Sequence, residues 1–309
     1  MRNVIGRLIQ LVPTAVGALL LVFVLLRIVP GDPAAAILGS QATAGAIADL
    51  RAEMGLNKPL YAQFIDYCSG LIHLNLGQSL SLNVPVAGLV ATALLPTLLL
   101  TAASIVITLV VGIPLGVVAA LGRGKLSDYV SSIVSLVGIS APGFVWAVLL
   151  LFVFAVHWKI FPNAGVGSTP LGVLRALVLP AVATGMAGVG VIARIMRSSL
   201  LAVLPLDYVR TGHAKGLDPL MVLNRHALRN ALIPVLTVVG LNVATLLQGA
   251  LVVELVFTRA GLGRLTLDAI QARDYPVLQG VMIFSVLVIV VVNIIVDVLY
   301  GVVDPRVRA

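Results

Sequence analysis

The chain has 309 residues, of which 60% are hydrophobic and only 10% are charged. Soluble domains have about a quarter of their residues charged, so this composition and a mean hydropathy of +1.12 exclude an ordinary soluble protein. A single cysteine, Cys68, excludes an intrachain disulfide or a cysteine-based zinc site, and the formal net charge is +8.

Six long stretches without charge predict membrane-spanning helices, because about 20 apolar helical residues cross the hydrocarbon and an ion at its centre costs roughly 3 kcal/mol. They are residues 8–26, a span inside 94–121, 129–156, 176–193, 230–253 and 275–296. The first follows Arg2 and Arg7 but is longer than the apolar core of a signal peptide, so we interpret it as an uncleaved anchor. We expect an all-α polytopic membrane protein with six transmembrane helices.

The segment after the first span contains two further helical patterns. One begins after Thr43 and stops at Gly55, and the other opens at Pro59. Their apolar faces are Ile47, Leu50 and Met54 in the first pattern and Leu60, Phe64, Tyr67 and Leu71 in the second. An ordered helical cap outside the membrane is therefore expected.

Small residues on the second and fourth spans predict close helix packing, since lipid supplies no hydrophobic force between helices. Gly112 and Gly116 form one such pair, with Pro114 between them as an alternative hinge. The fourth span carries Ala181, Gly185 and Gly188 in a similar arrangement.

The charged residues are distributed unequally between the two sides of the membrane in the predicted topology. With the N-terminus inside, the inner segments carry twelve basic and four acidic residues and the outer segments eight basic and seven acidic, with Asp297 inside the sixth span. The positive-inside rule then places both termini in the cytoplasm. The net basicity reflects topology and does not indicate a nucleic-acid partner.

Catalytic signatures are missing from the sequence. No P-loop, GxSxG, HExxH or CxxC pattern occurs. His213 and His226 have no carboxylate spaced to join them in a metal site. We expect no catalytic residue, no metal site and no cofactor bound by this chain.

Residues 205–230 are an unusually charged stretch between two apolar spans. Pro205 and Asp207 begin a short helix that ends at Gly216, where glycine adopts the left-handed conformation cheaply. Asp218 followed by Pro219 begins a second helix that is predicted to end near Leu232.

The faces of these two helices indicate what they contact. Gly212 and Ala214 leave part of the first helix nearly flat for another protein's groove. On the second, Arg225 and Arg229 share one face, and the other carries Leu220, Leu223 and Ala227. Docking to a protein and lying on the inner leaflet are both open on this evidence.

Motifs along the whole chain carry a resemblance to a known family. They are YVRTGHAKG at 208–216, HALRNALIP at 226–234, PGDP at 30–33, LPTLLLT at 95–101, GLGRL at 261–265, RDYP at 273–276 and VDVLYGVVDPRVR at 296–308. The sequence resembles ABC importer permeases of the dipeptide/oligopeptide/nickel group, and specifically the first of their two permease subunits.

The resemblance implies a type I importer fold in which Asp207 to Gly216 form a coupling helix that contacts a cytoplasmic ATPase. The residues it assigns to that contact and its support are Asp207, Tyr208, Arg210, Thr211, His213, Ala214, Lys215, Gly216, His226, Arg229 and Asn230. It further implies a second permease subunit, two ATPase subunits that bind ATP and Mg, an extracytoplasmic binding protein, and a place in the cytoplasmic membrane.

Five residues depart from the family pattern. Gly212 and His213 stand where Ala and Arg are more common, and Arg259 and Ala260 stand where Trp and Pro precede the GLG. Asn75 replaces a usual Asp. The departures concern the expected ATPase contact and the docking of the binding protein on the outer surface, residues 30–93 and 254–274.

Polar residues inside the spans are candidates for the pore, since such groups usually face a bundle interior. They are Asn242, Gln248 and Asn293. For Asp297 we expect an ion pair with Arg194 or Arg197 near the inner face.

The expected domains are an N-terminal transmembrane helix at 1–29, an extracytoplasmic helical insert at 30–92, a permease core at 93–302 with a coupling loop at about 198–230, and a cytoplasmic tail at 303–309. The predicted function is import of di- or oligopeptides delivered by a binding protein. Glutathione or nickel complexes are the alternative cargo, and a stand-alone secondary transporter or a structural subunit is the alternative class.

Overall fold

The computed structural model describes residues 13, 16–17, 19–21, 23–24, 33–38, 42–53, 55–73, 75–165 and 169–303. In these residues every regular element is a helix, apart from an isolated bridge between Gln78 and Pro85. The helices are α2 Pro33–Leu38, α3 Ala44–Glu53, α4 Leu60–Ile72, α5 Val86–Leu121, α6 Leu126–Ser140, α7 Gly143–Leu150, η1 Leu151–His157, α8 Pro170–Val203, α9 Asp207–Ala214, α10 Pro219–Val222, η2 Leu223–Ala227, α11 Leu228–Val256, α12 Leu262–Gln271 and α13 Tyr275–Val303. Helices η1 and η2 are π-helical.

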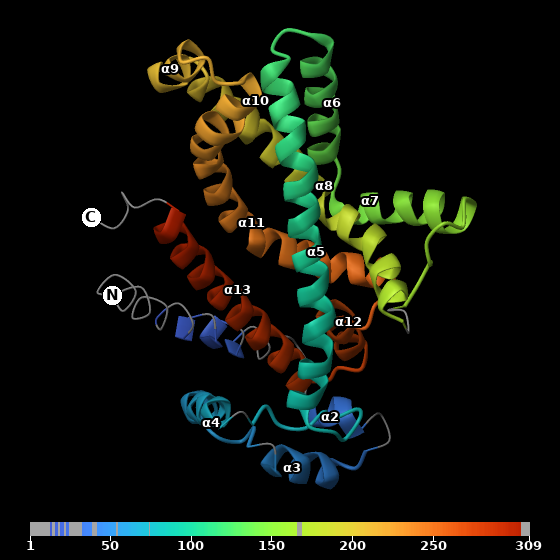
Figure 1. The fold of residues 1–309 in the computed structure, drawn as a ribbon. Helices are drawn as coiled ribbons and strands as arrows, with labels where there is room; N and C mark the ends of the chain where they lie inside the picture. Colours follow the sequence, from blue (N-terminus) through green and yellow to red (C-terminus); the bar gives the residue numbers. More distant parts are fainter. Residues whose placement is uncertain are drawn as a thin grey trace. The chain divides into compact units, whose positions relative to one another are not determined.

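The chain divides into two compact units. Figure 1 labels their helices. The first unit comprises Met1–Pro96 and Ala260–Val291, and the second comprises Thr97–Arg259 and Val292–Ala309. The residues 205–230 lie in the second unit.

Four helical stretches are long and apolar enough to cross a membrane. They are Val86–Leu121, Pro170–Val203, Pro219–Val256 and Tyr275–Val292. These helices cover the second, fourth, fifth and sixth predicted spans. Most of the first predicted span, residues 8–26, lies outside the described residues.

The third predicted span, residues 129–156, is not one continuous helix. Helix α6 ends at Ser140, and the helix formed by α7 and η1 continues at an angle of 104°. The break occurs because Pro142 forces the preceding residue out of helical geometry, and Ala141 is accordingly extended, with φ −118° and ψ 140°. The stretch is apolar enough to cross a membrane only if the bent pair is counted as one span.

Helix α8 is the centre of the second unit, where α6, α7 and α11 pack against it. A β-carbon on Gly112 of α5 would lie 3.0 Å from the carbonyl oxygen of Val189, and one on Gly116 would lie 2.5 Å from that of Ala193. Glycine is required at both places because the helix backbones are nearly in contact. The predicted packing role of these glycines is confirmed, and α5 continues through Pro114.

The two helices predicted after the first span are present in the first unit. Helix α3 begins after Thr43, whose hydroxyl accepts a hydrogen bond from the Ala46 amide at 3.3 Å, and the chain turns at Gly55 with φ +66°. Helix α4 begins after Pro59 and packs Phe64 and Tyr67 against Phe23, with ring centroids 5.2 and 5.9 Å apart. Ile47 and Leu50 are half-buried, and Met54 lies outside the described residues.

Candidate functional site

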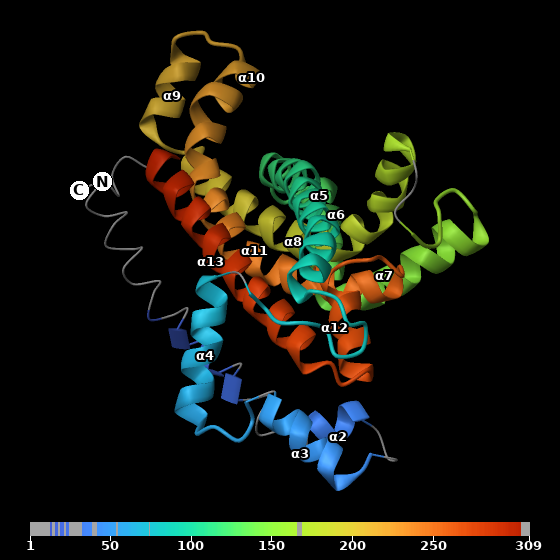
Figure 2. The ribbon, with the colours of Figure 1, turned by 90° about the horizontal axis from the view of Figure 1, so that it is seen from below.

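Helices α9 and α10, with the turn between them, form a hairpin at the start of α11 (Figure 2). Helix α9 spans Asp207–Ala214 and so begins at the predicted residue and ends two residues before the predicted Gly216; its N-cap position is Leu206. Gly216 follows with φ +77°, and its amide donates to the carbonyl oxygen of His213 at 2.9 Å. The left-handed glycine ends the helix and turns the chain towards α10.

Gly212 is the closest point of contact inside the hairpin. It is buried, and a β-carbon there would lie 3.3 Å from Cγ2 of Val222 and 3.9 Å from Cδ2 of His226. The expectation that Gly212 forms part of a flat outer surface is therefore wrong, because its small size serves packing within this chain. Ala214, the other residue of that prediction, is exposed.

A side-chain hydrogen bond fastens the first turn of α9 to the first turn of α11. The Asn230 amide donates to the Tyr208 hydroxyl at 2.9 Å and to the carbonyl oxygen of His226 at 3.2 Å. Val209, one residue further along α9, is 1% exposed. Tyr208, His226 and Asn230 are thus brought together as supports of the hairpin.

The second helix of the hairpin begins as predicted. The Asp218 carboxylate accepts from the amides of Leu220 at 3.0 Å and Met221 at 3.3 Å, and Pro219 occupies the first helical position. The predicted end near Leu232 is wrong, because helical geometry continues through η2 and past Pro234 to Val256. The second helix of the hairpin and the fifth predicted span therefore form one helical stretch, Pro219–Val256.

The π turn changes which residues of this helix are buried. A π turn contains an extra residue and rotates the preceding segment relative to the following one. Val222 is 1% exposed, whereas Leu220, predicted to share a face with Leu223 and Ala227, is 66% exposed. Ala227 is buried as expected, and Arg225 and Arg229 are exposed.

The exposed surface of α9 and of the turn after it is polar. Its exposed residues include Asp207, Tyr208, Arg210, Thr211, His213, Ala214 and Lys215. Thr211 and His213 also bond to backbone carbonyl oxygens one turn earlier, at 2.8 and 3.0 Å. Helix α10, beside this polar surface, exposes the apolar side chains of Leu220 and Met221. A partner that covers the whole hairpin would therefore contact both charged and apolar groups.

The polar residues of the spans lie in different environments. Asn242 is half-buried and donates to the carbonyl oxygen of Val238 at 2.8 Å, whereas Gln248 is exposed. Gln248 shares one face of α11 with the exposed Leu241 and Thr245. The side chains of Asn293 and Asp297 lie outside the described residues, so their roles stay predictions.

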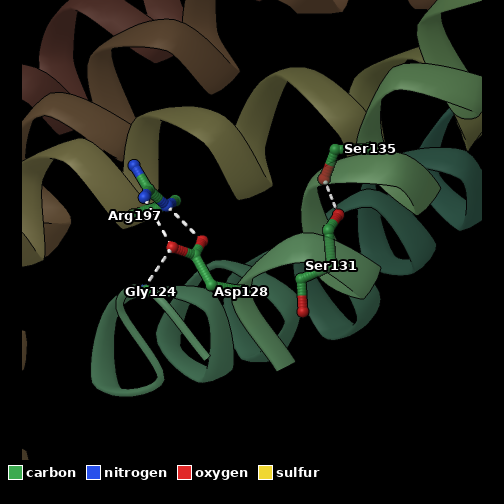
Figure 3. A network of polar contacts seen from close by, with 5 residues as sticks. All are labelled: Gly124, Asp128, Ser131, Ser135 and Arg197. Carbon is green, nitrogen blue, oxygen red and sulfur yellow. Dashed lines mark hydrogen bonds and ion pairs between the residues drawn. The ribbon is translucent and has the colours of Figure 1, made fainter. Parts of the chain in front are cut away.

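Arg197 has a partner that sequence reasoning missed. Its Nε donates to Oδ1 of Asp128 at 2.7 Å and its Nη2 to Oδ2 at 2.8 Å, a bidentate pair (Figure 3). Arg194, the other predicted partner of Asp297, is exposed. One signal was available, since Asp128 is the only acidic residue in the short inner segment that contains Arg123 and Lys125.

Three of the six charged residues of the segment 254–274 are buried, contrary to their expected place on an outer docking surface. Glu254, Arg259 and Asp274 are 0%, 1% and 1% exposed. The Glu254 carboxylate accepts from the Thr97 hydroxyl at 2.6 Å, and Nη1 of Arg259 donates to the carbonyl oxygen of Ala176 at 3.2 Å. The accessible charged residues of the segment are Arg264 and Asp268 on α12 and Arg273 after it.

Asp274 joins the start of α13 to the turn before α5 in the first unit. Its carboxylate accepts from the hydroxyls of Ser79 at 2.5 Å and Ser81 at 2.8 Å and from the Val277 amide at 3.3 Å. Burial alone would raise the pKa of Asp274, but the hydrogen bonds from Ser79 and Ser81 outweigh it and lower the pKa below 3.8. The carboxylate is therefore charged at neutral pH.

In the part of the chain that the structure describes, no three His, Cys, Asp or Glu side chains come together as a group that could hold a metal ion. Nδ1 of His213 lies 3.0 Å from the carbonyl oxygen of Val209, and the ring of His226 lies beside Gly212.

Comparison with known families and proteins gives a consistent result. The family described as "Binding-protein-dependent transport system inner membrane component" matches residues 112–309, and its N-terminal counterpart matches residues 1–90. The dipeptide transport system permease protein DppB of Escherichia coli (strain K12) is 39% identical over 332 residues, which cover 99% of this chain and 98% of that protein.

Two further relatives are similar over the same extent. A putative peptide transport system permease protein of Brucella abortus (strain 2308) is 40% identical over 308 residues, and the glutathione transport system permease protein GsiC of Escherichia coli O6:H1 is 40% identical over 305. Each alignment covers 99% of this chain and 98% of the relative.

Solved structures share the fold at low sequence identity. An inward-facing structure of the MetNI methionine ABC transporter has a TM-score of 0.58 at 19% identity, over 70% of this chain and 96% of that one. A crystal structure of an amino acid ABC transporter with histidines has a TM-score of 0.52 at 20% identity, over 71% and 94%.

Proposed function

The chain belongs to the family of binding-protein-dependent transport system inner membrane components, and from that premise we propose that it is a permease subunit of an ATP-driven peptide importer. Peptides would be delivered by an extracytoplasmic binding protein and released into the cytoplasm. Relatives named as dipeptide and peptide permeases, at 39–40% identity over nearly the whole chain, support this cargo class.

The observation that carries the proposal is the α9–α10 hairpin. Its first helix, α9, exposes a polar surface. The bond between Asn230 and Tyr208 fastens α9 to α11, and the close approach of Gly212 to Val222 packs α9 against α10. A rigid hairpin that joins two apolar helices is suited to transmit movement from a separate protein. The ATPase-contact residues would be those exposed on α9 and in its turn, with His226, Arg229 and Asn230 in support.

ATP would be hydrolysed by two partner ATPase subunits, which also bind Mg, while this chain hydrolyses nothing and binds no cofactor. A second permease subunit would complete the pore. Asn242, Gln248 and Asn293 are its proposed polar lining. The chain's contribution is a half-pore and the hairpin through which the ATPases act.

We place six helices across the cytoplasmic membrane, with the bent pair of α6 and α7–η1 as one of them. The excess of twelve basic over four acidic residues on the hairpin side supports cytoplasmic termini and a cytoplasmic hairpin. Residues 30–92 then form an extracytoplasmic insert, which with α12 is the proposed docking surface for the binding protein. Residues 93–302 are the permease core.

In the proposed mechanism, ATP binding draws the two ATPases together and the hairpins follow them. The permease pair then changes from an inward-open to an outward-open state. A loaded binding protein favours the outward state only to the extent that it binds that state more tightly, because equal affinity shifts no equilibrium.

Purification and reconstitution test the proposal. We expect the tagged chain, solubilised from its native membrane, to bring down a second permease and ATPase subunits, and the reconstituted complex to take up peptide only with ATP and the loaded binding protein. A chain that transports alone would be a secondary transporter, and a complex with neither uptake nor nucleotide dependence would be structural.

The cargo is identified through the binding protein. A ligand at 100 times its dissociation constant stabilises a protein by about 2.7 kcal/mol, which a thermal melt detects. We expect dipeptides or longer peptides to raise the melting temperature. Stabilisation by glutathione alone, or by a nickel chelate alone, would contradict the peptide assignment and leave the importer assignment intact.

A further inference from the structure

Helices α6 and α8 are joined along a face made of small and polar residues. The buried residues of α6 are Asp128, Ser131, Ser135 and Gly138. A β-carbon on Gly138 would lie 2.8 Å from the carbonyl oxygen of Met186, and one on Gly190 would overlap the carbonyl oxygen of Ser135. The backbones therefore interlock where residues 135–138 of α6 meet residues 186–190 of α8. The first turn of α6 is held by a different contact.

The ion pair of Asp128 and Arg197 closes this interface at the end that leads to α9. Arg197 binds both carboxylate oxygens, and the Gly124 amide donates to Oδ2 of Asp128 at 3.1 Å (Figure 3). The side chain of Asp128 is 10% exposed and that of Arg197 is 33% exposed. The pair therefore fixes both the first turn of α6 and the turn that joins α5 to α6.

Only three residues separate α8 from α9, and they are hydrogen-bonded. The Leu204 amide donates to the carbonyl oxygen of Leu200 at 3.0 Å, and the Leu206 amide donates to that of Val203 at 3.1 Å. The connection is a tight turn, so a displacement of α9 is passed directly to the last turns of α8, where Arg197 lies.

We propose that Asp128 and Arg197 are positioning residues that make α6 follow α8 when α9 moves. The inference rests on the proposed function, since it assumes that α9 receives the movement of an ATPase. The bidentate bond of Asp128 and Arg197 joins the α5–α6 turn to the helix that carries the hairpin, so that the two elements move as one body.

The test measures peptide uptake per ATP hydrolysed in the reconstituted complex with loaded binding protein. We expect Asp128→Asn and Arg197→Gln each to lower this ratio about fivefold, the lower end of typical coupling between two sites. The double variant should be no worse than either single one, because each change already breaks the same pair. Losses that multiply to about 25-fold in the double variant, or ratios equal to wild type, would overturn the inference.

Two further variants separate the pair from general effects. Arg123→Gln removes one exposed basic residue from the same turn and should leave the ratio unchanged; a similar loss would show that charge alone matters. If the single variants do not assemble, Arg197→Lys keeps the charge and loses the bidentate geometry. Its ratio should fall, and a ratio at the wild-type value would overturn the inference. A wild-type complex without uptake would instead refute the proposed function.

Discussion

Replacing Gly216 with valine should uncouple the importer while the complex still assembles. No atom lies within 4 Å of a β-carbon at this position, so the substitution meets no steric obstacle and acts through the backbone, which has φ +77°. A β-branched residue in this conformation costs about 2 kcal/mol, or roughly thirtyfold in the population of the native turn. Native stabilities of about 5–15 kcal/mol absorb that cost, so the fold survives.

The turn itself would change. The amide of Gly216 donates to His213 at 2.9 Å and that of Leu217 to Gly212 at 3.3 Å, and both bonds depend on the left-handed residue. Peptide uptake and binding-protein-stimulated ATP hydrolysis measure the effect. Gly216→Asn is the matched control, because asparagine tolerates the left-handed region, and it should retain most activity. Near wild-type uptake by the valine variant would refute the assignment of α9 as the coupling helix.

Three other changes test the same framework. Tyr208→Phe removes the hydroxyl that accepts a hydrogen bond from Asn230. Because such a bond is worth about 1 kcal/mol, we expect roughly fivefold slower peptide uptake with normal assembly. Unchanged uptake would mean that the bond does not support the hairpin. Gly116→Ala places a methyl group 2.5 Å from the carbonyl oxygen of Ala193 and should lower the melting temperature of the purified complex. Gly88→Ala is the control in the same helix, because a methyl group there meets nothing within 4 Å, and it should leave the melting temperature unchanged. Equal melting temperatures of the two variants would contradict the close packing of α5 against α8. Asp274 has a lowered pKa, so its stabilising contribution is complete above its ordinary pKa of 3.8 and is lost as pH falls through the lowered value. The wild-type melting temperature should therefore fall more steeply below about pH 4 than that of Asp274→Asn. If the two melting temperatures fell equally with pH, protonation of Asp274 would not be a cause of the acid destabilisation.

Local chemistry explains which elements were predictable. Gly216 and the pair Asp218–Pro219 set the ends of α9 and α10 through their own backbone and capping preferences, and both are found where the sequence places them. The role of Gly112 and Gly116 in α5 was equally predictable, because small residues in a membrane helix allow another helix backbone to approach closely.

Long-range contacts explain what the sequence left undetermined. Asp128 and Arg197 are 69 residues apart, and Ser79 and Asp274 are 195 apart, so the local sequence does not identify the partner of either carboxylate. For Asp128 it shows only that a single acidic residue lies in a basic inner segment. Gly212 illustrates a different ambiguity. A glycine on a short helix allows another group to approach the helix backbone closely. Only the fold decides whether that group is Val222 of the same chain or a residue of another protein.

The attachment of the hairpin to two packed helices determines how its movement is distributed. Helix α8 precedes it, and η2 and α11 follow it without interruption. Buried residues from both flanks form one cluster, with Ile192, Met196 and Leu200 from α8 and Ala227, Ala231 and Val235 from η2 and α11. Moving one flank alone would open a cavity in this cluster, at a cost of a few kcal/mol for each large side chain that loses its contacts. The two helices must therefore move together, and a force applied to α9 reaches the exposed face of α11 that carries Gln248.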